Sequence, residues 1–177
     1  MTTAAPLDWF QRVVDVPDYP KPGILFKDIT PLLADPAAFG AVIDLFAAAA
    51  RPLAPTQIVA IESRGFIFGG ALARALDVGL TIVRKPGKLP RPTRRVSYAL
   101  EYGTDTLEMH ADALTASDRA LILDDVLATG GTAGAVGELV TATGALVAGY
   151  AFLLELGFLS GRQRLPPGVP VVALRTI

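Results

Sequence analysis

Short runs of valine, isoleucine and leucine alternate with alanine-rich segments of helical period along most of the chain. Each helical segment is followed by an apolar run after about two to six residues, the spacing that α/β units favour. This alternation predicts an α/β fold with a mostly parallel central sheet flanked by helices. The predicted strands cover residues 57–63, 80–85, 119–125, 146–156 and 170–174, and the predicted helices cover residues 36–52, 66–77 and 132–143.

Two regions break this alternation. Residues 95–110 contain two β-like runs around the turn "YGTD", which predicts an antiparallel hairpin that projects from the sheet as a flap. Residues 16–33 contain four prolines and no sustained period, so this segment is expected to cross the surface as an irregular lobe. Neither an internal repeat nor a low-complexity linker is evident.

Length and charge limit the kind of protein. The chain has 177 residues, 51% of them hydrophobic, which suits one sizeable core and a single domain over residues 1–177. The formal net charge of -1 leaves no basic surplus to attract nucleic acid or an anionic membrane, so neither is expected as a partner. Charged residues and prolines interrupt the N-terminal segment, and no later stretch approaches about eighteen unbroken apolar residues. We therefore expect a soluble, cytoplasmic protein.

Composition also limits the chemistry. The chain has no cysteine, which excludes disulfides and thiolate metal sites, and its one histidine, His110, makes a histidine zinc site or a catalytic triad implausible. No metal-ligating set is predicted. Catalysis must therefore rely on carboxylates, basic side chains and backbone amides.

The stretch "ALILDDVLATGGTA", residues 120–133, carries the clearest chemical signal. A buried strand ends in Asp124 and Asp125, and open α/β sheets bind ligands at this edge. Glycines at 130 and 131 let consecutive N–H groups converge, and the start of the next helix adds partial positive charge. This loop suits a phosphate monoester, while the two carboxylates suit a ribose diol, so the pattern predicts a ribose 5-phosphate ligand.

Other interpretations of this loop remain. The glycines could make only a strand-to-helix turn that the aspartates cap. A nucleotide-hydrolase loop fits poorly, because Gly-x-x-x-x-Gly-Lys-Ser/Thr is absent. A dinucleotide-binding fold is possible, because Glu155 ends the next strand where a ribose-binding acid could stand. However, the Gly-x-Gly-x-x-Gly pattern is missing and two acids would repel a pyrophosphate.

The stretch 120–133 resembles the phosphoribosyl-pyrophosphate motif of the type I phosphoribosyltransferases, in which a strand runs into two acids and a Thr-Gly-Gly-Thr loop. Five other segments are similar to those of the adenine phosphoribosyltransferases in order and spacing. They are "KPGILFKDITPLL", "IESRGFIFG", "VRKPGKLP", "YALEYGTDTLEMHADAL" and "LELGFLSGRQRL". The resemblance covers nearly the whole chain.

The resemblance implies the type I phosphoribosyltransferase fold, with a small N-terminal hood over residues 1–35 and a core over residues 36–177 that carries a flexible flap at about 87–110. It implies the conversion of adenine and phosphoribosyl pyrophosphate to AMP and pyrophosphate. Mg²⁺ is the implied cofactor, bound through the substrate pyrophosphate, and a homodimer is the implied assembly.

The resemblance also assigns residues. Phosphoribosyl pyrophosphate is expected to bind Ser63, Arg64, Lys85, Lys88, Tyr102, Asp124, Asp125, Ala128, Thr129, Gly130, Gly131 and Thr132. The implied catalytic residues are Glu101 and Arg64, and the implied adenine-binding residues are Leu25, Phe26, Lys27 and Val126. The peptide between Glu62 and Ser63 is typically cis in the family, and Glu108 is expected to be exposed. Lys27 stands where many members carry arginine, and Glu62 where aspartate is common.

Two alternative functions are weighed against this one. A 6-oxopurine phosphoribosyltransferase normally uses a lysine from the strand at 146–156, and that strand has none. A regulator that only senses phosphoribosyl pyrophosphate usually carries a DNA-binding segment, for which this chain has no basic cluster.

Overall fold

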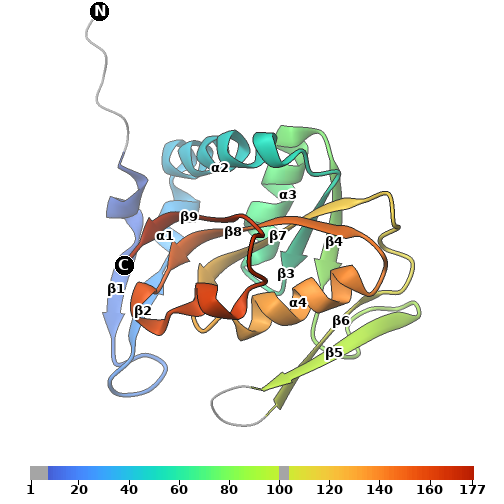
Figure 1. Ribbon diagram of the computed structural model, residues 1–177. Helices are drawn as coiled ribbons and strands as arrows, with labels where there is room; N and C mark the ends of the chain where they lie inside the picture. Colours follow the sequence, from blue (N-terminus) through green and yellow to red (C-terminus); the bar gives the residue numbers. More distant parts are fainter. Residues whose placement is uncertain (1–7, 100–103) are drawn as a thin grey trace, which may run out of the picture. The chain divides into compact units, whose positions relative to one another are not determined.

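The computed structural model describes residues 8–99 and 104–177. These residues divide into two compact units, one ending at Leu45 and the other covering Phe46–Ile177. Helix α2 (Pro36–Ala50) passes from the first unit into the second. The first unit contains a two-stranded sheet, and the second contains a five-stranded and a two-stranded sheet (Figure 1).

The second unit contains a five-stranded parallel sheet with the strand order β4-β3-β7-β8-β9. All five strands and the three long helices predicted from the sequence are present. The strands are β3 (Gln57–Ile61), β4 (Gly79–Val83), β7 (Arg119–Leu127), β8 (Leu146–Glu155) and β9 (Val171–Thr176). Its helices are α3 (Gly65–Leu76) and α4 (Gly131–Thr141), with short 3-10 helices η2 (Arg51–Leu53), η3 (Gly157–Leu159) and η4 (Gly161–Arg164).

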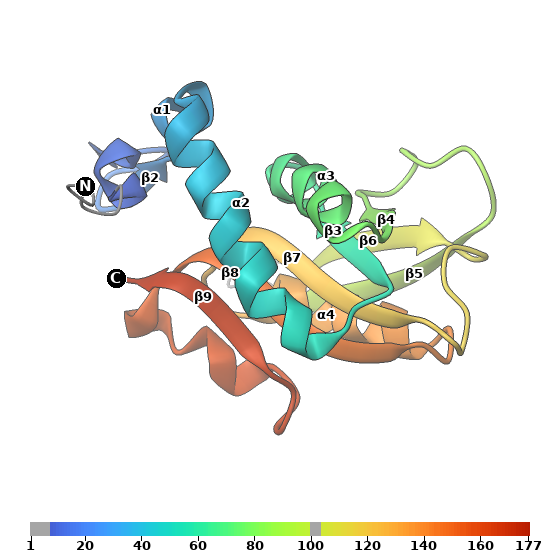
Figure 2. The same cartoon turned by 90° about the horizontal axis from the view of Figure 1, so that it is seen from above.

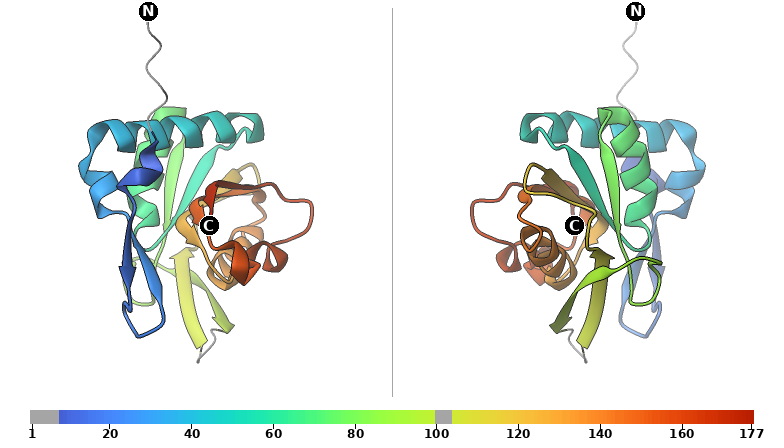
Figure 3. Two further views of the ribbon diagram at one scale, coloured as in Figure 1. Left: turned by 90° about the vertical axis from the view of Figure 1, so that its left-hand side faces the viewer. Right: turned by 90° about the vertical axis from the view of Figure 1, so that its right-hand side faces the viewer.

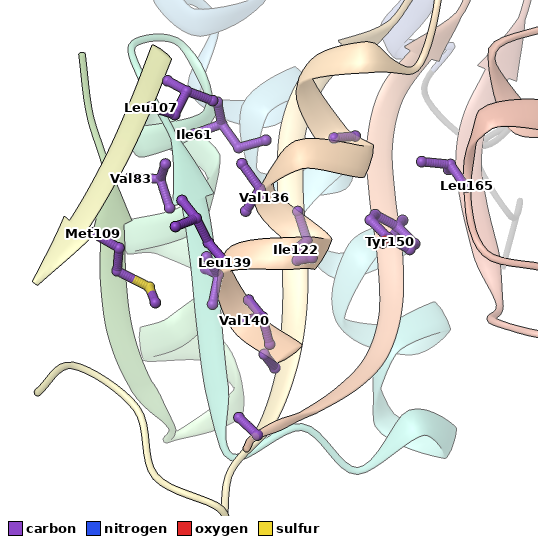
Figure 4. Packing of buried hydrophobic residues seen from close by; sticks show 14 of the residues in the cluster. Ile61, Val83, Leu107, Met109, Ile122, Val136, Leu139, Val140, Tyr150 and Leu165 are labelled. Carbon is purple, nitrogen blue, oxygen red and sulfur yellow. The ribbon is translucent and has the colours of Figure 1, made fainter. Parts of the chain in front are cut away.

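Helices α3 and α4 cover opposite faces of this sheet (Figure 2). A Cβ atom at Gly69 of α3 would lie 2.6 Å from Ala60 Cβ, so α3 packs closely on one face of β3. Val59 and Ile61 point to the other face and belong, with Val136 of α4, to the main hydrophobic cluster. Figure 4 labels Ile61 and Val136 in this cluster. Because both faces are covered, the central strands read as continuous apolar runs in the sequence.

The predicted hairpin consists of β5 (Thr93–Ala99) and β6 (Thr104–His110), paired antiparallel from Thr93↔His110 to Ala99↔Thr104. Figure 3 shows the two strands running together away from the five-stranded sheet. Their base nevertheless belongs to the core, because Leu107 and Met109 are buried in the cluster that α4 covers. The hairpin is therefore anchored at one end.

The first unit is more regular than the sequence predicts. Strands β1 (Val14–Pro17) and β2 (Leu25–Asp28) form an antiparallel ribbon, accompanied by η1 (Trp9–Arg12) and α1 (Thr30–Ala34). Asp18 and Gly23 both have positive φ, and the Gly23 N–H donates to Asp18 Oδ1 over 2.7 Å. This turn, which includes a cis peptide bond before Pro20, connects the two strands. Proline is disfavoured in the interior of a strand but is tolerated at its end, where β1 has its proline. The two four-residue strands can therefore form on either side of the turn.

One helical stretch among the described residues, Pro36–Leu53, is long and apolar enough to cross a membrane, judged by length and composition alone. Its mean hydropathy is 1.3 and a third of it is buried. Core helices of soluble proteins also meet this criterion, so the stretch carries little weight as a membrane span.

Candidate active site

A cavity of about 340 Å³ lies in the second unit, at the edge of the sheet where the parallel strands end. It brings together the β3–α3 connection, the end of β4, the hairpin and the end of β7. Seven of the residues expected to bind ligand line this cavity: Ser63, Arg64, Lys85, Asp124, Asp125, Val126 and Thr132. Four further lining residues were not expected from the sequence: Glu62, Tyr98, Asp105 and Leu107.

The two acids at the end of β7 form an electrostatically unbalanced pair. Asp125 is 5% exposed, and its Oδ2 lies 2.7 Å from Arg64 Nε, while Asp124 Oδ1 accepts a hydrogen bond from the Asp125 N–H over 2.9 Å. Burial and the charge of Asp125 raise the pKa of Asp124 well above its ordinary value. Burial also raises the pKa of Asp125, although Arg64 opposes that shift. The single positive charge of Arg64 therefore only partly offsets the charge of two carboxylates, so hydroxyl donors or a cation would stabilise the ionised pair further.

The glycine loop continues directly from these acids. Gly130 has φ +81° and precedes α4, an eleven-residue helix. A second cavity of about 70 Å³ lies at the loop and is lined by Asp124, Val126, Leu127, Ala128, Thr129, Gly130, Thr132, Ala133 and Phe152. Thr132 Oγ1 also donates to the Tyr98 hydroxyl over 3.2 Å. The loop thus presents hydroxyls and a helix N-terminus to a space of phosphate size, next to the acids.

The start of α3 approaches the end of β7 very closely. A Cβ atom at Gly65 would lie 2.9 Å from the Leu123 carbonyl oxygen and 3.1 Å from Asp124 Oδ1, so a side chain at this position would displace the acid. The preceding Glu62–Ser63 peptide is cis, as the family resemblance implies. This close packing places Arg64 beside Asp125.

Glu62 connects the same segment to the end of β4. It accepts hydrogen bonds from the Arg84 guanidinium at 3.3 Å and from the Lys85 N–H at 2.9 Å. Burial alone would raise the pKa of Glu62, but these donors and the nearby positive charges lower it. Glu62 is therefore held ionised between two loops that line the cavity.

The two lysines of the following loop differ in position. Lys85 lines the cavity, with its Nζ 3.7 Å from Asp105 Oδ2. Lys88 is exposed and does not line the cavity, although its carbonyl oxygen accepts a hydrogen bond from Arg84 over 3.3 Å. The structure therefore brings Lys85 to the acids more directly than Lys88.

The expectation that Glu108 is exposed is wrong, since only 1% of the residue is accessible. Its carboxylate accepts from the Gly87 N–H at 2.8 Å, from Thr93 Oγ1 at 3.1 Å and from Arg95 Nε at 2.9 Å. Its backbone forms a bridge with Arg84. Alternation along β6 turns Glu108 away from the core, but the loop after β4 folds over that face and buries it.

The expected adenine-binding residues lie in different units. Leu25, Phe26 and Lys27 belong to β2 of the first unit, where Lys27 Nζ lies 2.6 Å from Asp15 Oδ1. The Phe26 ring meets Tyr19 edge to face, with centroids 5.1 Å apart. Val126 lines both cavities of the second unit. The expected residues Glu101 and Tyr102 lie outside the described residues.

The order of acids, glycine loop and helix at the carboxyl edge of a parallel sheet, with a hairpin beside it, defines a phosphoribosyltransferase. The family model for the phosphoribosyl transferase domain matches residues 29–167.

Individual relatives narrow the class. An adenine phosphoribosyltransferase of Synechococcus sp. (strain JA-3-3Ab) is 59% identical over 156 residues, which make up 88% of this chain and 89% of that protein. A crystal structure of adenine phosphoribosyltransferase from Thermoanaerobacter pseudethanolicus is 47% identical, with a TM-score of 0.91 over 94% of this chain and 96% of that one. The chain belongs to the adenine phosphoribosyltransferase family.

A third relative was crystallised with ligands bound. The adenine phosphoribosyltransferase from Saccharomyces cerevisiae was crystallised with D-2,5-dideoxy-2,5-imino-altritol 1,6-bisphosphate and adenine. It is 41% identical to this chain, with a TM-score of 0.87 over 94% of this chain and 98% of that one. That protein binds a phosphorylated sugar analogue and the base together.

Proposed function

We propose that this chain salvages purines by transferring the 5-phosphoribosyl group of phosphoribosyl pyrophosphate to adenine, which yields AMP and pyrophosphate. The observation that carries this proposal is the juxtaposition of two acids, the half-buried Asp124 and the buried Asp125, with a glycine loop at one end of β7. The acids suit a diol and the loop suits a phosphate, and ribose 5-phosphate carries both groups. The choice of adenine as the base is inferred from membership of the adenine phosphoribosyltransferase family.

The sugar phosphate is expected to bind along the end of β7 and the start of α4. The amides of Ala128–Thr132 and the hydroxyl of Thr129 donate to the 5-phosphate, and the helix N-terminus favours its charge. Asp124 and Asp125 accept hydrogen bonds from the ribose hydroxyls. A bound diol supplies donors that the unbalanced acid pair otherwise lacks.

The leaving group needs positive charge. In the reaction the bond between the anomeric carbon and a pyrophosphate oxygen breaks, a bond to an adenine nitrogen forms, and that nitrogen loses its proton. Positive charge develops on the sugar ring and negative charge collects on the pyrophosphate. Arg64, the amide of Ser63, Lys85 and Lys88 would meet that negative charge. Arg64 is already oriented by its contact with Asp125, so little reorganisation is needed.

The residues present fit a magnesium ion carried by the substrate. Among residues 8–99 and 104–177, no group of three or more acidic, histidine or cysteine side chains could hold a metal alone. Mg²⁺ usually takes one or two carboxylates plus phosphate oxygens, and Asp124 and Asp125 would supply such carboxylates beside the sugar. When bound, the ion would neutralise charge on the pyrophosphate.

Base recognition is expected to come from the first unit. Leu25 and Lys27 are two residues apart on β2, so the carbonyl of the first and the amide of the second point to the same side of the strand. Such a pair matches the amino donor at C6 and the acceptor at N1 of adenine. Phe26 would stack on the adenine ring. From the family resemblance alone, we also propose Val126 as a base contact and Glu101 as the residue that transfers the proton on the ring nitrogen.

The family resemblance also leads us to propose Mg²⁺ dependence, a homodimer and a cytoplasmic location. Light scattering coupled to size exclusion tests the assembly, and a monomer at enzyme-assay concentrations would contradict the dimer.

Pyrophosphate release with adenine, hypoxanthine, guanine or no base tests the proposed reaction. Hypoxanthine has an oxygen at C6 and a proton on N1, so both backbone contacts become mismatched. We expect kcat/KM for adenine to exceed that for hypoxanthine by about 10⁴. Equal use of hypoxanthine would overturn the adenine assignment, and release without any base would indicate simple hydrolysis. Lys27→Ala should leave the ratio nearly unchanged, because the amide remains.

A further inference from the structure

The segment "LELGFLSGRQRL", residues 154–165, contributes no side chain to either cavity. It leaves the end of β8, forms η3 and η4, and leads towards β9. The segment nevertheless contacts the backbone of the glycine loop, which lines the smaller cavity at the end of β7.

Gly161 and the loop meet backbone to backbone. A Cβ atom at Gly161 would lie 2.2 Å from the Ala128 carbonyl oxygen and 3.1 Å from the Gly130 nitrogen. Reciprocally, a Cβ atom at Gly130 would lie 2.2 Å from the Gly161 carbonyl oxygen. Both distances are far below van der Waals contact, so neither position accepts a side chain unless the loop moves. The two glycines therefore fix how far the loop can retreat from a ligand.

An ion pair holds the Gly161 segment in place. Arg162 Nε lies 2.7 Å from Glu155 Oε1, and Arg162 Nη1 donates to the Val171 carbonyl oxygen over 2.9 Å. Glu155 is 6% exposed and also accepts from Thr176 Oγ1 over 3.2 Å. The pair thus connects η4 to the end of β8 and to β9. The last residue of the segment, Leu165, is buried in the hydrophobic core.

We infer that Glu155 and Arg162 are positioning residues, which act through Gly161 to hold the Ala128–Gly130 backbone where its amides meet the 5-phosphate. This inference rests on the proposed function of that loop. Donors that are already in place cost no reorganisation when the anion binds, whereas a loop free to move back would lose contacts. The pair itself touches no substrate.

The inference makes a ligand-specific prediction. Ribose 5-phosphate uses the loop, whereas pyrophosphate with Mg²⁺ uses the Ser63–Arg64 side of the cavity. Glu155→Gln and Arg162→Gln should therefore each weaken ribose 5-phosphate binding about tenfold and leave pyrophosphate binding within about twofold, measured by calorimetry. Arg162→Lys keeps the charge but cannot make both contacts, so it should fall between wild type and Arg162→Gln.

Gly161→Ala should have a larger effect, about a hundredfold on ribose 5-phosphate, because the added methyl group must displace the loop. Gly70→Ala is the matched control, since a Cβ atom there would meet nothing within 4 Å. If Gly161→Ala fails to fold, Glu155→Gln, which preserves side-chain shape, decides the question.

Each outcome has one interpretation. Selective loss of ribose 5-phosphate binding supports the inference. Equal loss of both ligands would indicate general structural damage, and unchanged binding of both would show that the loop keeps its position without the pair; either result overturns the inference. If the wild type itself does not bind ribose 5-phosphate, the proposed function fails first and the inference fails with it.

Discussion

The carboxylates of Asp124 and Asp125 at the end of β7 and the buried carboxylate of Glu108 at the base of the hairpin have pKa values shifted in opposite directions. Asp124 and Asp125 share Arg64, and burial raises the pKa of both. Burial would also raise the pKa of Glu108, but donors from Gly87, Thr93 and Arg95 lower it instead. Burial alone therefore does not distinguish a ligand-binding acid from a structural one.

The balance of donors makes the distinction. Glu108 already has three donors, so its carboxylate has no need of a ligand and instead fixes the loop after β4 to the hairpin. The acids of β7 have fewer donors than their oxygens can accept. A site of this kind costs stability in the free protein and recovers it when ligand binds.

The largest expected effect comes from removing both charges at the end of β7. Asp124→Asn with Asp125→Asn should lower kcat/KM by more than about a hundredfold, because amides offer the diol no charged acceptor. The free energy of unfolding of the free protein should stay the same or rise. Asp77→Asn is the control, since the side chain of Asp77 is 97% exposed. A loss of less than about tenfold, or about 1.4 kcal/mol, would contradict the diol role.

Glu108→Gln should produce the opposite combination. The amide cannot accept from all three donors as a carboxylate does, so the midpoint of urea unfolding should fall. The value of kcat/KM should fall only about tenfold, through a looser Lys85 loop. Glu138→Gln, on the exposed side of α4, is the control. A variant with normal stability and no activity would place Glu108 among the ligand-binding acids and remove the contrast.

The free energy of unfolding should depend on pH with opposite sign for Glu108 and for Asp124. The pKa of Glu108 is lowered from 4.5, so its stabilising contribution is present above pH 4.5 and is lost as the pH falls through the lowered value. The pKa of Asp124 is raised from 3.8, so its ionisation reduces stability as the pH rises from 3.8 through the raised value.

Urea unfolding between about pH 3 and pH 8 measures both effects. Glu108→Gln should flatten the acid side of the stability curve, whereas Asp124→Asn should increase stability near neutral pH. Curves that change in the same direction for both variants would show that the two groups are electrostatically alike.

The smallest expected effect concerns the link between the two regions. The Tyr98 hydroxyl accepts a hydrogen bond from Thr132 and so joins the hairpin to the start of α4. Tyr98→Phe removes one hydrogen bond of about 1 kcal/mol, so the free energy of unfolding should fall by about that amount and kcat/KM should fall about fivefold. A loss above about a hundredfold would mean that Tyr98 takes part in the chemistry directly.

The sequence predicted the β7 region well because its signals are local. Strand, acids, glycines and helix follow one another within residues 120–141, and the positive φ of Gly130 agrees with the turn that its glycine implied. Glu108 was wrongly predicted to be exposed and Tyr98 was not predicted to line the cavity, because the partners of both residues lie elsewhere in the chain. The loop that buries Glu108 has no periodic pattern from which its position could be predicted. The prolines of residues 16–33 led to the prediction of an irregular lobe in place of the short ribbon of β1 and β2.

The strand order described above has a consequence for how the cavity arises. From β3 the chain proceeds outward to β4, whereas from β7 it proceeds outward in the other direction to β8 and β9. The connections after β3 and β7 therefore diverge to opposite faces of the sheet, leaving a crevice at this topological switch point. The crevice is a product of connectivity, so its place in the fold is set by the strand order, whereas the residues of the two loops determine what it binds.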